Sequence, residues 1–406
     1  MNSWFVRIHF CFFVYIFQFI CVTIDSCILH EERKIKMNNN KEFLATEPIG
    51  KLLLRLAIPT LAAQMINMLY NIIDRIYIGH IPGSGALALT GVGVCMPLIM
   101  IISAFAALVG NGGAPRASIL MGKKDLDSAE NILGNCFTMQ IIISVILTLI
   151  MFFGNRTFLM AFGASENTIE YAVSYMNIYS LGTIFVQLTL GMNAFITAQG
   201  FAKTGMYSVL IGAVINIILD PIFIFACHMG VRGAALATII SQACSCIWVL
   251  SFLFGTRSTL RIKKQNLTLK APVILPCLAL GLSLFIMQAS ESIISVCFNS
   301  SLLKYGGDVA VGAMTILTSV MQFAMLPLQG LGQGAQPIMS YNYGAKNTER
   351  VKGTFLLLLK ASLTYSIILW GLVMLFPQVF AGIFTSNPAL VIFTKKACLL
   401  YTSDAA

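Results

Sequence analysis

The sequence pattern of residues 85–122 is repeated without a gap at residues 307–344, an offset of 222 residues. The residues shared by the two copies are mostly small or helix-bending. They are Gly85, Ala88, Gly110, Gly112, Pro115, Ser118 and Gly122 in the first copy, matched by Gly307, Ala310, Gly332, Gly334, Pro337, Ser340 and Gly344 in the second. Glycine, proline and serine matches packed so closely are not expected from composition alone. The chain is therefore interpreted as two copies of one structural unit.

Apolar residues make up 57% of the chain and charged residues 10%, with a mean hydropathy of +0.83. A soluble domain carries about a quarter charged residues, so lipid must be the solvent for much of this chain. An all-α polytopic membrane protein is predicted. The net charge of +10 does not indicate a nucleic-acid partner, because the basic residues lie in short connections between apolar segments. The cysteines lie in apolar runs without C-x-x-C spacing, which predicts neither a disulfide nor a metal site.

Apolar runs of about 20 residues, long enough to cross about 30 Å of hydrocarbon as helices, recur from Leu52 onward. Six of them fill the first repeat. An even number returns the chain to its starting side, so the two repeats share an orientation and are related by a pseudo-two-fold axis along the membrane normal. The predicted spans are 52–79, 86–112, 132–153, 172–198, 205–226, 233–254, 273–298, 309–331, 353–376 and 389–402.

Basic residues are concentrated in the connections after spans two, four, six and eight. The connections on the opposite side carry few basic residues other than Arg156, Arg232 and Lys304. By the positive-inside rule, the first true span starts in the cytoplasm of a plasma-membrane protein. Residues 255–272 then form a basic cytoplasmic linker between an N-terminal six-helix lobe at 43–254 and a C-terminal lobe at 273–406.

Both ends of the chain depart from this pattern. Residues 1–42 are expected to form an N-terminal extension. Residues 1–36 are expected to lie upstream of a protein that begins at Met37, with an extra anchor or uncleaved signal segment as the alternative. At the other end, the repeat offset places the end of the second copy near residue 476, whereas the chain stops at Ala406. We therefore expect an incomplete C-terminal lobe of about four helices with non-native closing residues. The alternative is a naturally short, ten-span protein.

Polar residues inside the spans are the candidate functional residues, because a charge at the centre of a membrane helix is costly. Asp74, Asp220 and Thr238 each lie five or six residues from the outer end of their spans, which places them about 8 Å inside the outer boundary at 1.5 Å per residue. Asn216 is one turn from Asp220. Together they could coordinate a hard cation such as sodium or share a proton.

Alternative roles exist for each acidic residue. Asp74 could extend to the outer surface, and Asp220 could cap a helix broken at Pro221. Glu291 lies about seven residues from the outer end of span seven and could serve the second half of the protein. Gln64, Asn67, Gln187 and Asn193 are polar at mid-membrane, where they could line a substrate cavity or hydrogen-bond between helices.

Several segments resemble the multidrug and toxic compound extrusion (MATE) family. They are residues 48–59, residues 69–79 (Leu-Tyr-Asn-Ile-Ile-Asp-Arg-Ile-Tyr-Ile-Gly), Ala198-Gln-Gly200, residues 216–224 (Asn-Ile-Ile-Leu-Asp-Pro-Ile-Phe-Ile) and residues 233–238 (Gly-Ala-Ala-Leu-Ala-Thr). The resemblance covers about residues 43–397. It implies two six-helix bundles around a central cavity, and antiport in which sodium or proton entry drives export of a small organic compound.

Carried over by residue, the resemblance assigns the coupling ion to Asp74, Asn216, Asp220 and Thr238. Glu291 fits less well, because family members with an acid in helix seven place it about one turn earlier, where this chain has Met287. We expect a monomer with no cofactor beyond the coupling ion and with a cationic, amphipathic substrate.

Other classes of protein fit the sequence less well. No G-x-x-x-x-G-K-[ST] motif for ATP binding occurs, and the four histidines are scattered rather than clustered as an enzyme would require. The serious alternative is a flippase for lipid-linked oligosaccharides, which belongs to the same superfamily. Such a flippase is expected to have a more cationic central cavity, whereas the arginines here lie mainly at span ends and in loops.

Overall fold

The computed structural model describes residues 43–375, and for much of residues 292–324 it describes the backbone alone. The chain divides into two units between Thr46 and Glu47. In the first unit the described part is the short helix α2 (Phe43–Thr46). The second unit holds every other helix discussed below. The predictions for residues 1–42, for the span at 389–402 and for the closing residues lie outside the described residues.

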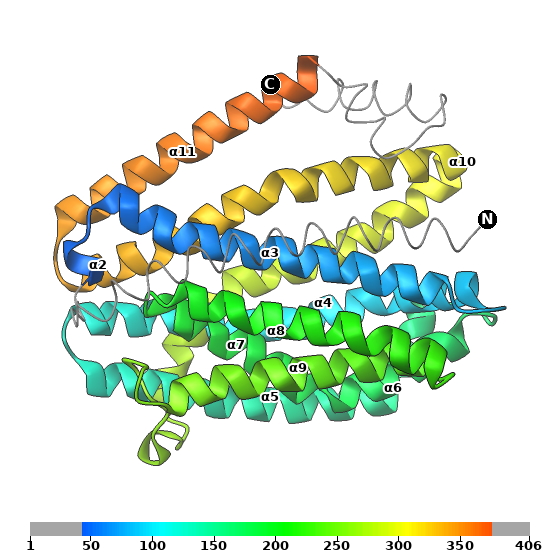
Figure 1. The fold of residues 1–406 in the computed structure, drawn as a ribbon, viewed down its shortest axis with the longest axis horizontal. Coiled ribbons are helices and arrows are strands. Elements are labelled where there is room, and N and C mark those ends of the chain that lie inside the picture. The colour runs from blue at the N-terminus through cyan, green and yellow to red at the C-terminus, as the bar shows by residue number, and fades with distance from the viewer. Residues whose placement is uncertain (1–42, 376–406) are drawn as a thin grey trace. The chain divides into compact units, whose positions relative to one another are not determined.

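The described part of the second unit is built from helices, and Figure 1 shows their order. The first repeat comprises α3 (Ile49–Gly79), α4 (Gly85–Gly122), α5 (Leu126–Ala161), α6 (Ile169–Leu181), α7 (Thr183–Ala198), α8 (Ala202–Pro221), the π-helical segment η1 (Ile222–Ala226) and α9 (Val231–Phe254). Helices α6 and α7 meet at an angle of 58° and form one broken span. Counted this way, the first repeat has the six spans that the sequence predicts.

The predicted single span 172–198 is bent at Gly182, which ends α6. The side chain of Ile239 from α9 lies directly over this glycine, so a larger residue there would collide with it. The bend therefore coincides with a close helix–helix contact rather than with a loop. Glycine allows this close approach because it has no side chain.

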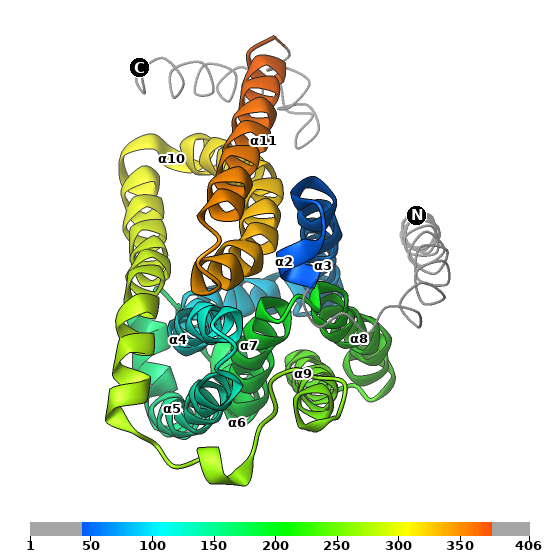
Figure 2. The ribbon, with the colours of Figure 1, turned by 90° about the vertical axis from the view of Figure 1, so that its left-hand side faces the viewer.

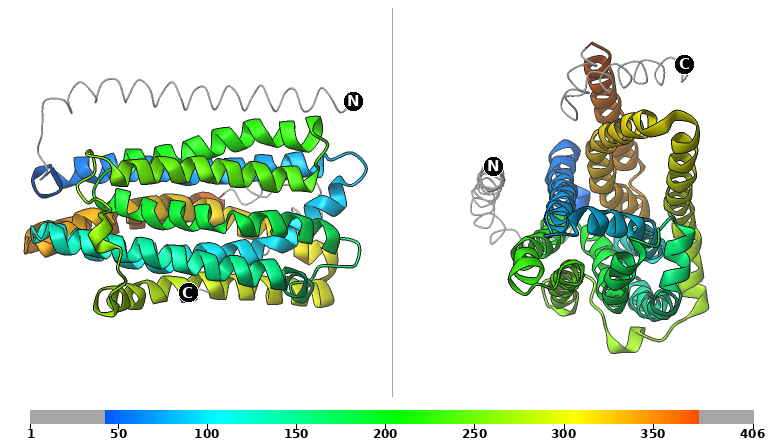
Figure 3. Two further views of the ribbon diagram at one scale, coloured as in Figure 1. Left: turned by 90° about the horizontal axis from the view of Figure 1, so that it is seen from below. Right: turned by 90° about the vertical axis from the view of Figure 1, so that its right-hand side faces the viewer.

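Helix α10 (Ala271–Gly344) continues through 74 residues of the second repeat. Figures 2 and 3 show that it turns back on itself, so its beginning and end form two separate legs. The sequence predicts two spans here, 273–298 and 309–331, with a loop between them. In the structure the connection is itself helical, and residues 299–308 contain no proline that would end the helix. Helix α11 (Thr348–Leu375) follows.

The repeat seen in the sequence is also a repeat of backbone geometry. Helix α4 ends at Gly122 and α10 ends at Gly344, which are equivalent positions. Two residues further on, Lys124 and Lys346 both adopt the left-handed conformation, with φ of 64° and 61°. A left-handed lysine is unusual, so its recurrence at the same offset confirms that the two segments are structural copies.

The next helix of each repeat also begins in the same way. In α5 the Ser128 backbone N–H donates to the Asp125 carboxylate at 3.1 Å, and in α11 the Arg350 N–H donates to the Asn347 side-chain oxygen at 3.2 Å. These are equivalent N-caps, which satisfy donors that a helix start leaves free. Hydrogen bonds from Ser128 hold the pKa of Asp125 below its usual value.

The two repeats cross where α4 and α10 end. A Cβ atom added to Gly122 would overlap the carbonyl oxygen of Tyr341, and one added to Gly344 would overlap the carbonyl oxygen of Ile119. Ile119 and Tyr341 are equivalent under the repeat, so the contact is reciprocal. The crossing therefore depends on backbone touching backbone, as small residues permit between membrane helices.

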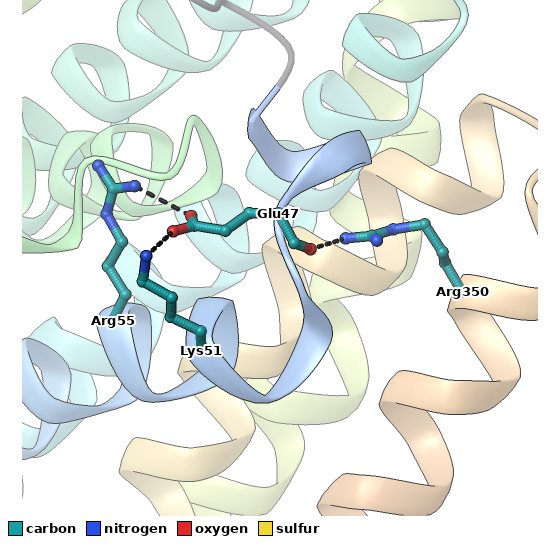
Figure 4. A network of polar contacts seen from close by, with 4 residues as sticks. All are labelled: Glu47, Lys51, Arg55 and Arg350. Carbon is teal, nitrogen blue, oxygen red and sulfur yellow. Dashed lines mark hydrogen bonds and ion pairs between the residues drawn. The ribbon is translucent and has the colours of Figure 1, made fainter. Parts of the chain in front are cut away.

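A polar network joins the start of α3 to α11 at this same end of the repeats (Figure 4). Arg350 donates from Nη2 to the Glu47 carbonyl oxygen at 2.7 Å. The Glu47 carboxylate in turn pairs with Arg55 at 3.0 Å and with Lys51 at 3.4 Å. The Arg350 contact links the second repeat to the beginning of the first.

Figure 2 shows the linker that joins α9 to α10. Hydrogen bonds and an ion pair fasten it to the first repeat. Buried Glu130 of α5 accepts a hydrogen bond from the Arg261 N–H at 3.3 Å and pairs with Lys263, which raises the pKa of that lysine. Buried Gln199 accepts from the Leu260 N–H at 2.9 Å. Thr138 of α5 donates to the Leu267 carbonyl at 2.7 Å. The linker is thus a docked segment.

We expect Glu130→Ala to loosen the linker. The substitution leaves linker donors without their acceptor, at a cost of about 1–3 kcal/mol, so trypsin should cleave at the linker arginines and lysines at least about fivefold faster. Limited proteolysis in detergent measures this. Glu170→Ala, which removes the exposed ion pair with Arg156, is the control and should leave linker cleavage unchanged. Equal cleavage in both variants would contradict the role of Glu130.

Candidate functional site

Helices α3 and α8 bring three of the predicted coupling residues together. Asp74 of α3 and Asp220 of α8 are 6% and 0% exposed, and their carboxyl groups interact with each other. Asn216, 1% exposed, donates from Nδ2 to Asp220 Oδ1 at 3.3 Å. Two acidic side chains and an amide thus form one buried polar cluster.

Three oxygen atoms of this cluster have no hydrogen-bond partner among the described residues: Asp74 Oδ1, Asn216 Oδ1 and Asp220 Oδ2. A buried polar atom left without a partner costs about 1–3 kcal/mol, and a buried charge costs more. The oxygens are carboxylate and amide atoms, which are ligands that hard cations prefer. The donor set therefore fits a sodium ion or a proton.

The alternative roles of the two aspartates can be compared with this geometry. Asp74 is buried against α8, so it does not extend to the outer surface. Asp220 lies one residue before Pro221, and the hydrogen bond that its side chain accepts comes from the Asn216 amide rather than from a backbone N–H of η1. Its contacts are instead with Asn216 and Asp74.

The local sequence explains why α8 changes shape beside Asp220. Pro221 has no N–H and its ring crowds the carbonyl four residues earlier, which disrupts a regular α-helix. The helix continues as the π-helical segment η1, and such segments are frequent at functional sites. The ring of Phe225 in η1 lies 6.3 Å from that of Tyr77, so η1 also packs against the end of α3.

Thr238 of α9 lies beside this cluster rather than within it. Its hydroxyl donates to the Ala234 carbonyl at 3.0 Å in its own helix. Buried Tyr175 of α6 lies close enough to Thr238 and Asp74 for both to affect its hydroxyl. Thr238 is therefore near the carboxylates, although its own hydrogen bond is within α9.

Three tyrosines complete the surroundings of the site, and the sequence analysis missed all of them. Tyr70 interacts with Asp74 and with Asn71, while Tyr175 and Tyr179 are buried and stack with centroids 5.9 Å apart. Tyr175 and Tyr179 are spaced one turn apart in a predicted span. Two tyrosines one turn apart at the depth of Asp74 could have indicated a polar site in the sequence, because a buried tyrosine hydroxyl needs a hydrogen-bond partner.

The predicted cavity residues occupy different settings. Buried Gln187 donates to the Ile102 carbonyl at 2.7 Å, and Asn193 donates to the Gly205 carbonyl at 3.3 Å, so both make helix–helix hydrogen bonds. Asn67 is exposed and Gln64 is half-buried on α3. Glu291 is exposed on α10. A contribution of these side chains to substrate binding stays a prediction.

Comparison with known proteins identifies the family of this chain. The MatE family model matches residues 59–222 and 283–402. The chain belongs to the MatE family. MatE proteins are transporters rather than enzymes, and they act on small molecules within the membrane. The match spans both repeats and includes Asp74, Asn216 and Asp220, but it ends before Thr238 and does not cover the linker.

Individual MatE relatives and structures agree with this. The multidrug export protein MepA of Staphylococcus haemolyticus is 25% identical over 344 residues, covering 85% of this chain and 75% of the relative. The outward-facing conformation of a multidrug resistance MATE family transporter superposes with a TM-score of 0.80 at 25% identity, covering 89% of this chain and 80% of that one.

A MOP superfamily transporter from Pyrococcus furiosus is equally similar, with a TM-score of 0.80 at 25% identity over 89% of this chain and 80% of that chain. That protein is described as having a binding pocket of reverse polarity, which suggests a different function for it. Similarity to these transporters confirms the predicted two-lobe membrane fold. Transporters that share this fold can therefore differ in the polarity of their binding pockets, so the fold alone does not define the substrate of this chain.

Proposed function

We propose that this MatE protein is a secondary active antiporter that exports cationic, amphipathic organic compounds in exchange for sodium ions or protons. The observation that carries the proposal is the set of three unpartnered, buried oxygens on α3 and α8. Asp74, Asn216 and Asp220 would hold the coupling ion, with Thr238 nearby. The name of the MepA relative, a multidrug export protein, supports the direction of transport.

The coupling mechanism follows from the charges at the site. Two unit charges about 4 Å apart repel by about 4 kcal/mol at an effective dielectric constant of 20. An empty, ionised pair therefore favours separation of α3 from α8, and a bound cation or proton removes that repulsion. The helices then close on each other and change the wall that α3 contributes to the substrate path. Ion and substrate are coupled because each prefers the opposite arrangement.

The proposed orientation places the start of α3 and the linker in the cytoplasm of a plasma-membrane protein. The basic residues around the α4–α5 and α10–α11 turns support it. In that orientation the crossing at Gly122 and Gly344 closes the cytoplasmic side. The likeness to an outward-facing transporter is consistent with this state. We propose that one copy of the chain is the transporting unit, because each ion-site residue comes from the same first repeat.

Export from proteoliposomes tests the proposal. The protein is reconstituted, and movement of a cationic dye is followed under a sodium gradient alone, a proton gradient alone, and neither. Export driven by one gradient supports the antiporter and names its ion. Dye movement that is unaffected by either gradient, in protein shown to be folded, would contradict the antiporter proposal. Translocation of a fluorescent lipid-linked oligosaccharide without either gradient would favour the flippase.

A further inference from the structure

One face of α3 contacts the second repeat over only part of its length. Ala57 and Leu61 lie on this face and pack against Gly334 and Gly330 of α10. Arg75 is 18 residues beyond Ala57, which is about five full turns at 3.6 residues per turn, so it lies on the same face. Near Arg75, however, the groove on this face is walled by α3 and α4 alone. The face is therefore uncovered there by the described residues.

This groove combines an apolar wall with two basic side chains. It has a volume of about 430 Å³ and is lined by Ile72, Arg75, Ile76, Gly79, His80 and Leu89. Ile72, Ile76 and Leu89 are 44%, 48% and 38% exposed, so they present open hydrocarbon surface. His80 is held in place by a 2.7 Å hydrogen bond between Nδ1 and the Ile76 carbonyl. Such a groove fits an amphiphile better than it fits a small soluble ion.

Arg75 is exposed and forms no hydrogen bond or ion pair with the residues that the structure describes. It lies four residues before the end of α3 at Gly79, which is about 6 Å along the axis. That position is at the level where long basic side chains reach the lipid headgroups. An arginine guanidinium matches a phosphate group in geometry as well as charge.

We propose that the groove of Arg75, His80, Ile72, Ile76 and Leu89 binds an anionic phospholipid, with its phosphate on Arg75 and an acyl chain along the isoleucines and Leu89. A free anion would have no use for the apolar wall. A zwitterionic lipid carries an amine beside its phosphate, which reduces its attraction to the Arg75 guanidinium. Binding of the lipid requires no transport activity, so the proposal stands apart from the antiporter function.

A lipid bound in the groove would also change the electrostatic field at the coupling site. Arg75 is adjacent to Asp74 and interacts with it electrostatically. A phosphate on Arg75 partly neutralises that guanidinium, so the field at Asp74 differs between the lipid-bound and lipid-free protein.

Native mass spectrometry of the full chain, released from nanodiscs of equal parts phosphatidylglycerol and phosphatidylethanolamine, tests the proposal. The ratio of retained phosphatidylglycerol to phosphatidylethanolamine should fall about fivefold in Arg75→Gln, the change that corresponds to about 1 kcal/mol for one basic residue near a lipid surface. Arg75→Lys keeps the charge and should retain most of the preference. Millimolar inorganic phosphate should not displace the lipid.

Arg232→Gln is the matched control, because Arg232 is also exposed and lies at the start of α9. The nearby segment η1 packs on Tyr77 near the end of α3. The control substitution removes the same charge from the same end of the protein and should leave the lipid ratio unchanged. An Arg75→Gln protein that retains the wild-type ratio would overturn the proposal. Equal losses in Arg75→Gln and Arg232→Gln, or displacement by phosphate, would overturn it as well.

Discussion

Asp220→Asn is expected to abolish ion-driven export while leaving the protein folded. The substitution keeps the shape of the side chain and its hydrogen bond with Asn216, but it removes the charge that the coupling ion neutralises. Coupling free energies of about 1–3 kcal/mol correspond to about 5- to 150-fold effects, so gradient-driven dye export should fall by at least the lower figure. Asp74→Asn should behave in the same way because its carboxyl group faces the same site.

Glu291→Gln supplies the comparison. Glu291 is also a carboxylate in a membrane helix, but it is exposed on α10 rather than buried between α3 and α8. Its neutralisation should leave gradient-driven export close to the wild-type rate. If Glu291→Gln abolished export and Asp220→Asn did not, the coupling site would lie in the second repeat. Size-exclusion profiles of the purified variants establish that each one is folded.

Gly344→Ala should destabilise the protein, because the added methyl group falls at the crossing of the two repeats. Its Cβ would overlap the Ile119 carbonyl, which belongs to the backbone and cannot rotate away. Overpacking of this kind costs about 1–3 kcal/mol, and more where the backbone must move. Gly122→Ala should have a comparable effect through the Tyr341 carbonyl. Thermal unfolding in detergent measures both.

Gly332→Ala is the control for this prediction. Gly332 lies in the same helix and belongs to the same repeat motif, yet no atom lies within 4 Å of the position that its Cβ would occupy. Alanine favours a helix over glycine by about 1 kcal/mol, so this variant should be unchanged or slightly more stable. Equal destabilisation of Gly332→Ala and Gly344→Ala would show that the crossing is not the source of the effect.

Much of this fold can be predicted from the sequence because membrane helices impose simple rules. Span length and depth within the span together bring Asp74 and Asp220 to one level, and a spacing of one turn adds Asn216. These are properties of single helices. They do not require knowledge of which helix faces which.

The features that sequence reasoning missed all depend on contacts between helices. Nothing in the span 172–198 reveals that Gly182 lies against Ile239, so the bend between α6 and α7 was not predicted. Tyr175 and Tyr179 adjoin the site only because α6 packs beside α9 and α4. The helical connection within α10 replaced a predicted loop, because polar residues alone do not end a helix when proline is absent.

The docked linker changes where flexibility between the repeats can lie. Its backbone is held by Glu130 and Gln199 near its beginning, and Thr138 binds Leu267 close to its end. Lys270, the last residue before α10, donates its N–H to Asn135 of α5 at 2.6 Å. No free tether therefore separates the repeats. Rocking of one repeat against the other would therefore have to be accommodated beyond Ala271, within α10 and its packing, and not in the linker.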